Sequence, residues 1–383
     1  MTWASEASYH LLKMEDLTFR CIRCEREYPL GTREWRCRCG GLFELAGPAS
    51  RFSKDEIIEE RSIWRYRAAL RLPEGVPQIT LGEGWTPLVD EAIYGLPVRF
   101  KLEFLMPTGS FKDRGAAVLV SFLKHLGVKE VVEDSSGNAA ASLAAYCARA
   151  GIRARIFVPS YASLGKLKQI QAYGAELVPV PGSRAEAARA AEEAVEAGSY
   201  YASHYWNPFV LEGLKTLAYE LAEQLSWRAP DNLIFPSGQG TFLLGTYHGF
   251  RGLFEAKLVE KLPRLFAVQA EACAPIAIAF QQGLEEPAEI EPRETVAEGV
   301  RIAKPIHGAQ VLTAIKKTDG AALAVTEEEI EQAQGELARR GLFIEPTSAV
   351  AVAGLKRLVE QGAIKPEELT VVPLTGSGLK AFS

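Results

Sequence analysis

After Thr86 the chain alternates between short runs rich in β-branched and aromatic residues and longer runs with apolar residues at helical spacing. The short runs predict strands at 98–104, from 129 onward, and at 153–158, 176–180, 232–236, 265–268 and 369–374. The longer runs predict helices at 116–124, 140–150, 184–197, 209–225, 242–255 and 327–340. This alternation is typical of parallel sheets covered by helices on both faces, so the pattern predicts an α/β fold.

A lysine stands at the first strand-to-helix junction. The segment reads Pro107-Thr-Gly-Ser-Phe-Lys-Asp-Arg-Gly115, between the predicted strand and helix. At such a turn Lys112 is partly desolvated and near the positive end of a helix, and both effects favour the neutral amine. A neutral amine can form a Schiff base with an aldehyde cofactor. For the lysine alone, a solvated residue at a helix cap is the alternative.

The second junction carries short polar side chains directly before a helix. These residues are Ser135, Ser136, Gly137 and Asn138. Free backbone N–H groups and short hydrogen-bonding side chains at a helix N-terminus suit a carboxylate or a phosphate. The same residues could serve only as a helix cap.

Two further junctions lie in the C-terminal half. The first is a glycine-containing loop that opens a helix, with Gly238, Gln239, Gly240 and Thr241. Its backbone N–H groups could hold a phosphate, although two glycines alone are weak evidence. The second is Thr375, where the last predicted strand ends, and its hydroxyl would face the crevice where α/β sheets bind ligands.

Four cysteines near the N-terminus have the spacing of two metal-binding turns. Cys21 and Cys24 enclose two residues, twelve residues follow, and Cys37 and Cys39 enclose one. Four thiolates on two turns suit tetrahedral zinc, so the spacing predicts a zinc site. A disulfide pair or free cysteines are the alternatives, and disulfides are disfavoured because no secretory leader is evident.

Charge and composition argue against two classes of partner. The net charge is −5, and the stretch 15–44 around the cysteines carries six Arg and six Asp or Glu, which is a poor footprint for nucleic acid. No run approaches eighteen apolar residues, so we expect no membrane span. The five histidines show no metal spacing, and for His248 and His307 we expect structural roles.

Two more segments complete a family resemblance. Leu81-Gly-Glu-Gly-Trp-Thr-Pro-Leu88 and Asn207-Pro-Phe-Val-Leu-Glu-Gly-Leu-Lys-Thr216, with the lysine segment and Thr375-Gly-Ser-Gly-Leu-Lys380, resemble the fold-type II enzymes that use pyridoxal 5′-phosphate (PLP). Within them the chain is most similar to the threonine synthase family. The resemblance covers nearly the whole chain.

The resemblance implies a role for each candidate. Lys112 would form the Schiff base with the cofactor, and Asn138 would hydrogen-bond its ring hydroxyl. The substrate carboxylate would meet Ser135, Ser136 and Gly137. The cofactor phosphate would be held by Gly238, Gln239, Gly240 and Thr241. Thr375 would face the pyridine nitrogen, and a hydroxyl there should leave that nitrogen unprotonated.

The resemblance also implies an organisation. Residues 1–48 would form a zinc-ribbon-like module, 49–110 and 206–383 the large PLP-binding domain, and 111–205 the small domain. Each of the two catalytic domains would have a parallel or mixed sheet with helices on both faces. We expect a cytoplasmic homodimer that acts on a small amino-acid substrate, with zinc as a structural ion.

Three positions depart from the family pattern. Trp85 and Met106 stand where relatives usually carry Asn, and Val210 stands where they usually carry an Arg that clamps a substrate phosphate. If the substrate is phosphorylated, another cation must offset its charge, and the candidates are Lys215, Lys166 and Lys168. The alternative is that the three departures together form an apolar pocket for an uncharged side chain.

The favoured activity is the conversion of O-phospho-L-homoserine and water to L-threonine and phosphate. A serine/threonine-type ammonia-lyase or a β-replacement enzyme is the alternative, because it needs the same lysine and cofactor but no site for a phosphate on the side chain. A non-catalytic zinc-ribbon binding protein is a remote third hypothesis.

Overall fold

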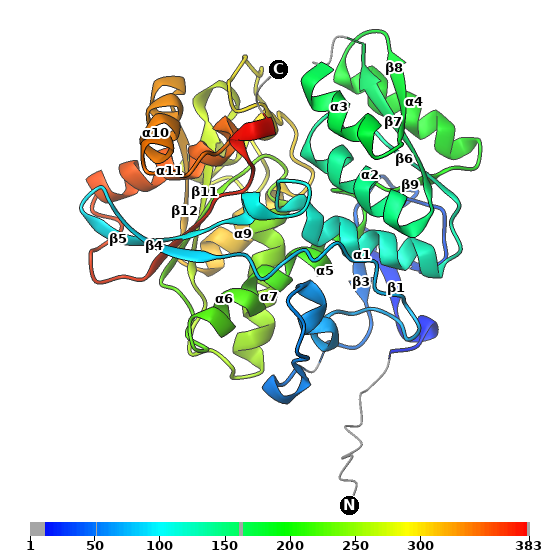
Figure 1. Cartoon of the computed structure of the whole chain (residues 1–383), viewed down its shortest axis with the longest axis horizontal. Coiled ribbons are helices and arrows are strands. Elements are labelled where there is room, and N and C mark those ends of the chain that lie inside the picture. The colour runs from blue at the N-terminus through cyan, green and yellow to red at the C-terminus, as the bar shows by residue number, and fades with distance from the viewer. Residues whose placement is uncertain (1–11, 51, 161–163, 381–383) are drawn as a thin grey trace, which may run out of the picture.

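The computed structural model describes residues 12–50, 52–160 and 164–380. Three sheets organise this part of the chain, and Figure 1 shows the two larger ones side by side. The N-terminal sheet is antiparallel with the order β2-β1-β3. Its strands are β1 (Thr18–Cys21), β2 (Glu27–Pro29) and β3 (Phe43–Ala46).

The largest sheet has six strands in the order β12-β11-β10-β13-β5-β4. Its strands are β4 (Leu88–Ile93), β5 (Leu96–Lys101), β10 (Asn232–Pro236), β11 (Arg264–Ala270), β12 (Ala321–Val325) and β13 (Thr370–Pro373). All neighbours are parallel except β4, which runs antiparallel to β5. The sheet is therefore mixed, with one antiparallel strand at an edge.

Helices cover both faces of this sheet. Along β10, Leu233 and Phe235 pack in one core cluster, whereas Ile234 packs in another. Successive side chains of a strand point to opposite faces, so the two clusters are the two sides of the sheet. The helices of this half are α7 (Thr241–Glu255), α8 (Pro275–Gln281), α9 (Gly308–Lys317), α10 (Glu327–Arg339) and α11 (Pro346–Glu360).

The third sheet has four parallel strands in the order β8-β7-β6-β9. They are β6 (Glu130–Glu133), β7 (Arg153–Pro159), β8 (Glu176–Val180) and β9 (Tyr200–Tyr201). The helices of this part are α1 (Lys112–His125), α2 (Asn138–Ala150), α3 (Leu164–Ala172) and α4 (Arg184–Glu196). The α1 helix packs against α2 on one side and α5 (Pro208–Leu214) on the other, so it joins the two halves of the molecule.

The helix predicted at 209–225 is two helices, α5 and α6 (Thr216–Gln224), divided at Lys215. The Thr216 hydroxyl donates to the Gly213 carbonyl at 2.6 Å and accepts from the buried Arg114 guanidinium at 3.0 Å. Contacts with a distant residue therefore fix the break, which the local pattern does not reveal. None of the helices in the described part of the chain is long and apolar enough to cross a membrane.

Candidate active site

Lys112 is the first residue of α1, and buried polar groups fix the turn before it. The Asp113 carboxylate accepts from Thr108 N at 2.8 Å, from Thr108 Oγ1 at 2.6 Å and from Ser142 Oγ at 2.6 Å. The backbone N–H of Phe111 donates to the Thr375 carbonyl at 3.0 Å. These bonds connect the start of α1 to α2 and to the segment after β13. They therefore fix the position of the backbone that carries Lys112.

The surroundings of Lys112 favour its neutral amine. Burial is the main cause that lowers the pKa of Lys112 to about 8, Arg184 lowers it further, and Glu133 and Glu345 oppose the shift. The Phe111 ring, whose centre lies 4.7 Å from Lys112 Nζ, favours the charged form and opposes part of this shift. The lysine is thus more nucleophilic near neutral pH than an exposed lysine would be.

Lys112 lines a pocket that opens to solvent and has about 340 Å³ of empty space when its open part is included. Helices α1, α2, α5 and α7 and the segment after β9 form its walls. The polar lining residues are Lys112, His204 and Thr241, and the apolar ones are Ala116, Leu119, Ala139, Leu143, Ala202, Val210 and Leu214. A mostly apolar cavity with a few polar groups and a perturbed amine is typical of a small-molecule site.

The predicted carboxylate-binding residues occupy the turn between β6 and α2. Ser135 Oγ accepts from Gly137 N at 3.2 Å, and Gly137 is the N-cap of α2. Asn138 Nδ2 donates to the Glu345 carboxylate at 2.9 and 3.1 Å. Glu345 N donates in turn to the Gly376 carbonyl at 3.0 Å, so this turn meets the C-terminal segment next to Thr375.

The glycine loop leads from β10 into α7. Gly240 has a φ of +75°, and a side chain there would begin 2.3 Å from Val311 Cγ2. Thr241 is the first residue of α7 and lines the pocket, whereas the Gln239 amide oxygen accepts from Ile306 N at 3.0 Å. The stacked Phe111 and Phe242 rings, 4.2 Å apart, join this loop to the lysine turn.

Two buried hydroxyls at the carboxyl ends of β10 and β13 have no hydrogen-bond partner among the described residues. They are Ser237 Oγ, just before the glycine loop, and Thr375 Oγ1. Buried polar groups are normally paired, so unpaired ones at the carboxyl ends of β10 and β13 fit a polar ligand that pairs them. With Lys112 and the left-handed Gly240, the residues present fit PLP.

A buried ion-pair network holds the lysine helix, and the sequence analysis gave no role to its members. Arg114 Nε and Nη2 each lie 2.7 Å from Glu103, and Arg114 Nη1 lies 2.9 Å from Glu220. Lys101 also pairs with Glu220, and all four side chains are fully buried. The sequence does carry a signal for this network, because its charged residues stand inside segments with an otherwise apolar strand or helix pattern.

A second missed group lies on the pocket wall. His204 follows β9, and its Nδ1 lies 2.8 Å from Glu133 Oε1 at the end of β6. Burial raises the pKa of Glu133 well above its usual value, and burial with the nearby Lys112 and Arg184 lowers the pKa of His204 well below its own. The five histidines show no metal spacing, and no local pattern distinguishes His204 from the other four.

The three departures from the family pattern do not meet in one pocket. Val210 lines the pocket, but neither Trp85 nor Met106 does. Trp85 lies under the Arg65 guanidinium, 4.9 Å from ring centre to charge, and Met106 is buried with its sulfur 3.2 Å from Gly84 N. The apolar pocket expected from the three together is therefore built from Val210 and other residues.

Two of the cations suggested for a substrate phosphate can be placed. Lys215 is buried, pairs with Glu212 at 2.8 Å, and reaches toward the Ala69 carbonyl at 3.4 Å. That pair removes Lys215 from the candidates, because its charge is already offset. Lys168 is exposed on α3, and the side chain of Lys166 lies outside the described residues.

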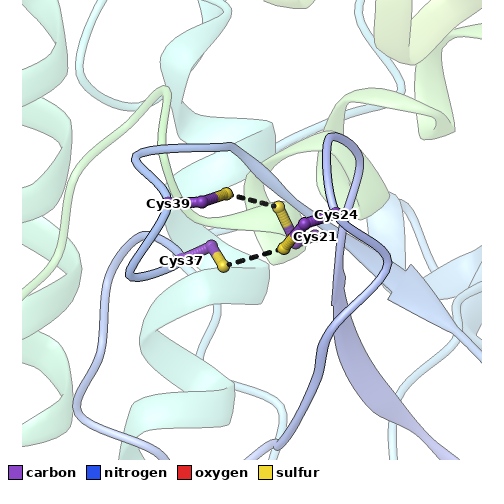
Figure 2. A group of neighbouring side chains, drawn as sticks. All are labelled: Cys21, Cys24, Cys37 and Cys39. Carbon is purple, nitrogen blue, oxygen red and sulfur yellow. Dashed lines mark hydrogen bonds between the residues drawn. The ribbon is translucent and has the colours of Figure 1, made fainter.

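The four N-terminal cysteines converge, as Figure 2 shows. Their sulfur atoms all lie within 4.8 Å of one another, with Cys21 to Cys39 and Cys24 to Cys37 each at 3.5 Å. Tetrahedral zinc bound by thiolates at about 2.3 Å would hold its sulfurs about 3.8 Å apart. The cluster could therefore hold a metal ion, and the tighter second turn does not prevent convergence.

The model of the family described as "Pyridoxal-phosphate dependent enzyme" matches residues 79–376, which include every segment around the pocket. A threonine synthase of Methanocaldococcus jannaschii is 37% identical over 94% of this chain and 92% of the relative. The chain belongs to the threonine synthase family of PLP-dependent enzymes. A threonine synthase of Methanosarcina acetivorans is 36% identical over 94% of this chain and 91% of its own length.

Solved structures share the fold. The processed form of threonine deaminase isoform 2 from Solanum lycopersicum is 24% identical with a TM-score of 0.67, over 76% of this chain and 79% of that chain. A serine racemase from Dictyostelium discoideum is 26% identical with a TM-score of 0.65, and the match covers 76% of this chain and 92% of that chain. The predicted α/β fold of the fold-type II enzymes, with mixed and parallel sheets, is confirmed.

Proposed function

We propose that this chain converts O-phospho-L-homoserine and water to L-threonine and phosphate with PLP as cofactor. The observation that carries the proposal is the near full-length similarity to threonine synthases, which includes the lysine turn and the glycine loop. The pocket supports it, because a lysine with a lowered pKa shares that cavity with the start of α7.

Each candidate residue has a proposed role toward the cofactor. When bound, PLP withdraws electrons from the bond to the substrate Cα and stabilises negative charge there. Lys112 would hold the cofactor covalently, and Asn138 would lie at its ring hydroxyl. Its phosphate would be held by Gly238, Gln239, Gly240, Thr241 and the unpaired Ser237 hydroxyl. The Thr375 hydroxyl would pair with the ring nitrogen.

The protein side of the reaction follows from the same groups. The turn of Ser135, Ser136 and Gly137 would bind the substrate carboxylate through hydroxyls and backbone N–H groups at the start of α2. Lys112, once released, would take a proton from Cα and then from Cβ, because its lowered pKa of about 8 leaves much of the amine neutral at slightly alkaline pH. The electron pair from Cβ–H would expel phosphate from Cγ, a proton would be delivered to Cγ, and water would add at Cβ as Cα is protonated again.

A substrate phosphate would need a positive partner, and we propose Arg184. This residue begins α4, and its charge acts on Lys112, Glu133 and His204, which supports a position near the pocket. Its side chain is exposed, so it can reach a ligand without losing an internal partner. It would replace the arginine that Val210 displaces from the family pattern.

A second candidate function is the removal of water and ammonia from serine or threonine. The observation that favours it is the apolar lining: seven of the ten residues that line the pocket are Ala, Leu or Val. Burying a phosphate against apolar walls costs several kcal/mol. A short hydroxylated side chain would fit such walls without a charged partner.

Product analysis separates the two functions. Purified enzyme would be incubated in turn with O-phospho-L-homoserine, L-homoserine, L-serine and L-threonine. Under the proposed function the first substrate yields threonine and phosphate with a kcat/KM well above that of any deamination, and free phosphate competes. A deamination rate above the rate of threonine formation would contradict it and favour the second function.

Arg184→Gln adds a test of the phosphate partner. Loss of a charged hydrogen bond should raise KM for O-phospho-L-homoserine by about tenfold or more, and leave KM for serine within about twofold. Arg189→Gln, on the same helix, is the matched control and should change neither value. Equal effects of both variants would exclude Arg184 as the partner.

Four further assignments belong to the same proposal. We infer that the cysteine cluster binds zinc as a structural ion, that the enzyme is a cytoplasmic homodimer, and that the chain divides into 1–48, 49–110 with 206–383, and 111–205. Metal analysis tests the zinc, and sedimentation at several protein concentrations tests the dimer. Limited proteolysis tests the division, because cleavage should concentrate near its boundaries.

A further inference from the structure

The pocket beside Lys112 contains a second titratable group, and its orientation is fixed. His204 lines the pocket, and its Nδ1 lies 2.8 Å from Glu133 Oε1. When Nδ1 carries the ring proton and donates it to Glu133, Nε2 is the free acceptor of the ring. Within the described residues Glu133 is the one hydrogen-bond partner found for this imidazole, so Nε2 is available to a ligand.

The Glu133–His204 pair is costly to maintain as a structural feature. The Glu133 side chain is 1% exposed, and its second carboxylate oxygen has no hydrogen-bond partner in the described part of the chain. A buried carboxylate with an unpaired oxygen destabilises the fold, and apolar side chains would fill the same space at less cost. Groups kept under such strain next to a reactive lysine are typical of catalytic sites.

We propose that His204, oriented by Glu133, is the group that moves the proton of the oxygen at the substrate Cβ. The inference rests on the proposed function, in which water adds at Cβ. The water oxygen forms the new bond to Cβ, one O–H bond breaks, and His204 Nε2 takes that proton. The electron pair of the Cα–Cβ double bond moves to Cα, which Lys112 then protonates.

The charges around His204 agree with this role. Glu133 faces it from β6, Lys112 from α1 and Arg184 from α4. Burial and the two cations lower the pKa of the imidazole, so the ring is neutral before the step, and Glu133 on Nδ1 faces the positive charge that forms when Nε2 takes a proton. In this scheme Lys112 transfers protons to and from carbon, and His204 transfers the proton of the oxygen at Cβ.

Chemical rescue tests the proton-transfer role directly. His204→Gly should lower kcat by about 100-fold to 1,000-fold, and added imidazole should restore at least tenfold of that loss, because general acid–base catalysis contributes about 10²–10⁴. His204→Asn should show the loss without rescue. His125→Asn, at the end of α1, is the control and should stay within about twofold. A His204→Gly enzyme that imidazole does not rescue would overturn the proposal.

A partial reaction locates the step. In D₂O, exchange of the Cα proton of L-2-aminobutyrate needs Lys112 but involves no oxygen at Cβ. His204→Asn should slow threonine formation at least tenfold more than it slows this exchange. Equal losses in both would mean that His204 only maintains the site, and would also overturn the proposal.

The protonation of His204 can be read without turnover. In protein labelled with ¹⁵N-histidine, the signal that disappears in His204→Asn should show a protonated Nδ1 and an unprotonated Nε2 at pH 8. Glu133→Gln should change that tautomer balance and shift the pH profile of kcat/KM. A protonated Nε2 at pH 8 in the wild type would contradict the role.

Failure of the proposed function can be told apart from failure of this inference. If the wild type forms no threonine but removes water from serine or threonine, the Cβ–O bond breaks instead of forming, and the same group would protonate the leaving oxygen. Imidazole rescue of His204→Gly in that reaction would support the inference, and its absence would overturn it.

Discussion

The chemistry of this molecule depends on single side chains whose surroundings change their ordinary behaviour. Lys112 is the clearest case, since burial rather than sequence context lowers its pKa. From the turn and the positive end of the helix, the sequence predicted that the neutral form of the amine is favoured. The structure adds Arg184 as a second cause, which comes from a helix that begins 72 residues later in the chain.

The first prediction concerns the pH dependence of the Lys112 amine. The cofactor-free protein should form a borohydride-trappable adduct with PLP at a rate that rises with pH, with its midpoint at about pH 8. The sign follows because the reactive neutral amine is present above the lowered pKa, whereas an exposed lysine would need a pH near 10. Arg184→Gln should move the midpoint upward, because a cation that disfavours the ammonium form is lost.

Two controls accompany that measurement. Lys112→Ala should form no adduct on the tryptic peptide that spans residue 112, and Lys124→Ala should react as the wild type does. A midpoint near 10 in the wild type, or trapping that persists in Lys112→Ala, would exclude the assignment.

The second prediction concerns the unpaired Thr375 hydroxyl. Thr375→Val keeps the shape but removes the buried oxygen that has no partner. The cofactor-free variant should be as stable as the wild type or more stable by about 1 kcal/mol, because an unsatisfied buried group costs about that much. PLP should bind more weakly, and Thr375→Ser should retain affinity. A variant that is less stable without cofactor would show that the hydroxyl has an internal role.

At the scale of elements, tertiary contacts decide what the local pattern cannot. The strand-to-helix junctions at Lys112, Asn138 and Thr241 lie where the apolar and glycine patterns predict them. The break between α5 and α6 depends on Arg114, which is distant in sequence. The short strand β12 is alanine-rich and shows no strand pattern of its own.

The third prediction concerns the packing of the glycine loop. Gly240→Ala should destabilise the protein by about 3 kcal/mol, since a left-handed residue costs about 1–2 kcal/mol and overpacking about 1–3 kcal/mol. The overlap arises because the new Cβ would lie 2.3 Å from Val311 Cγ2. Urea unfolding of the cofactor-free protein gives the value.

Gly341→Ala is the matched control for the cost of a left-handed backbone conformation. Its φ is +84°, and no heavy atom lies within 4 Å of the added Cβ, so it should show the conformational cost alone. Adding Val311→Ala to Gly240→Ala should recover part of the loss. Equal costs for the two glycine variants would exclude a packing role for Gly240.

At the scale of the whole molecule, the sequence predicted the fold class, the family and the segments that surround the pocket, because each carries a local pattern. It did not reveal which distant groups those segments meet. Asn138 contacts Glu345, His204 pairs with Glu133, and Lys215 is occupied by Glu212. Such pairings depend on how the sheets and helices pack, and the sequence of a single segment does not predict that packing. The roles of the site residues stay predictions.

The whole molecule also links the cysteine module to the active-site region. Trp35, between the two cysteine pairs, packs edge-on against Tyr201 at 5.2 Å and Trp206 at 4.8 Å between ring centres. Arg33 Nη1 donates to the Gly198 carbonyl at 2.9 Å. These contacts flank β9 and the segment that carries His204, so order in the module supports order there.

The last prediction follows from that link. A strong chelator should release about one zinc ion per chain, because four thiolates form one tetrahedral site. After the metal is lost, the thiolates of the four cysteines lie close together and repel one another, which destabilises the module. Hydrogen exchange should therefore accelerate first in β1–β3 and then, because of the Trp35 contacts, in residues 200–206. Trp35→Ala should accelerate only the second region and cost roughly 2 kcal/mol, about half the value for a fully buried Trp. Trp227→Ala is the control for removing an indole, because Trp227 packs on Phe52 and Lys54. If chelation releases no metal, or if exchange at 200–206 is unchanged after release, the module is structurally independent of the active-site region.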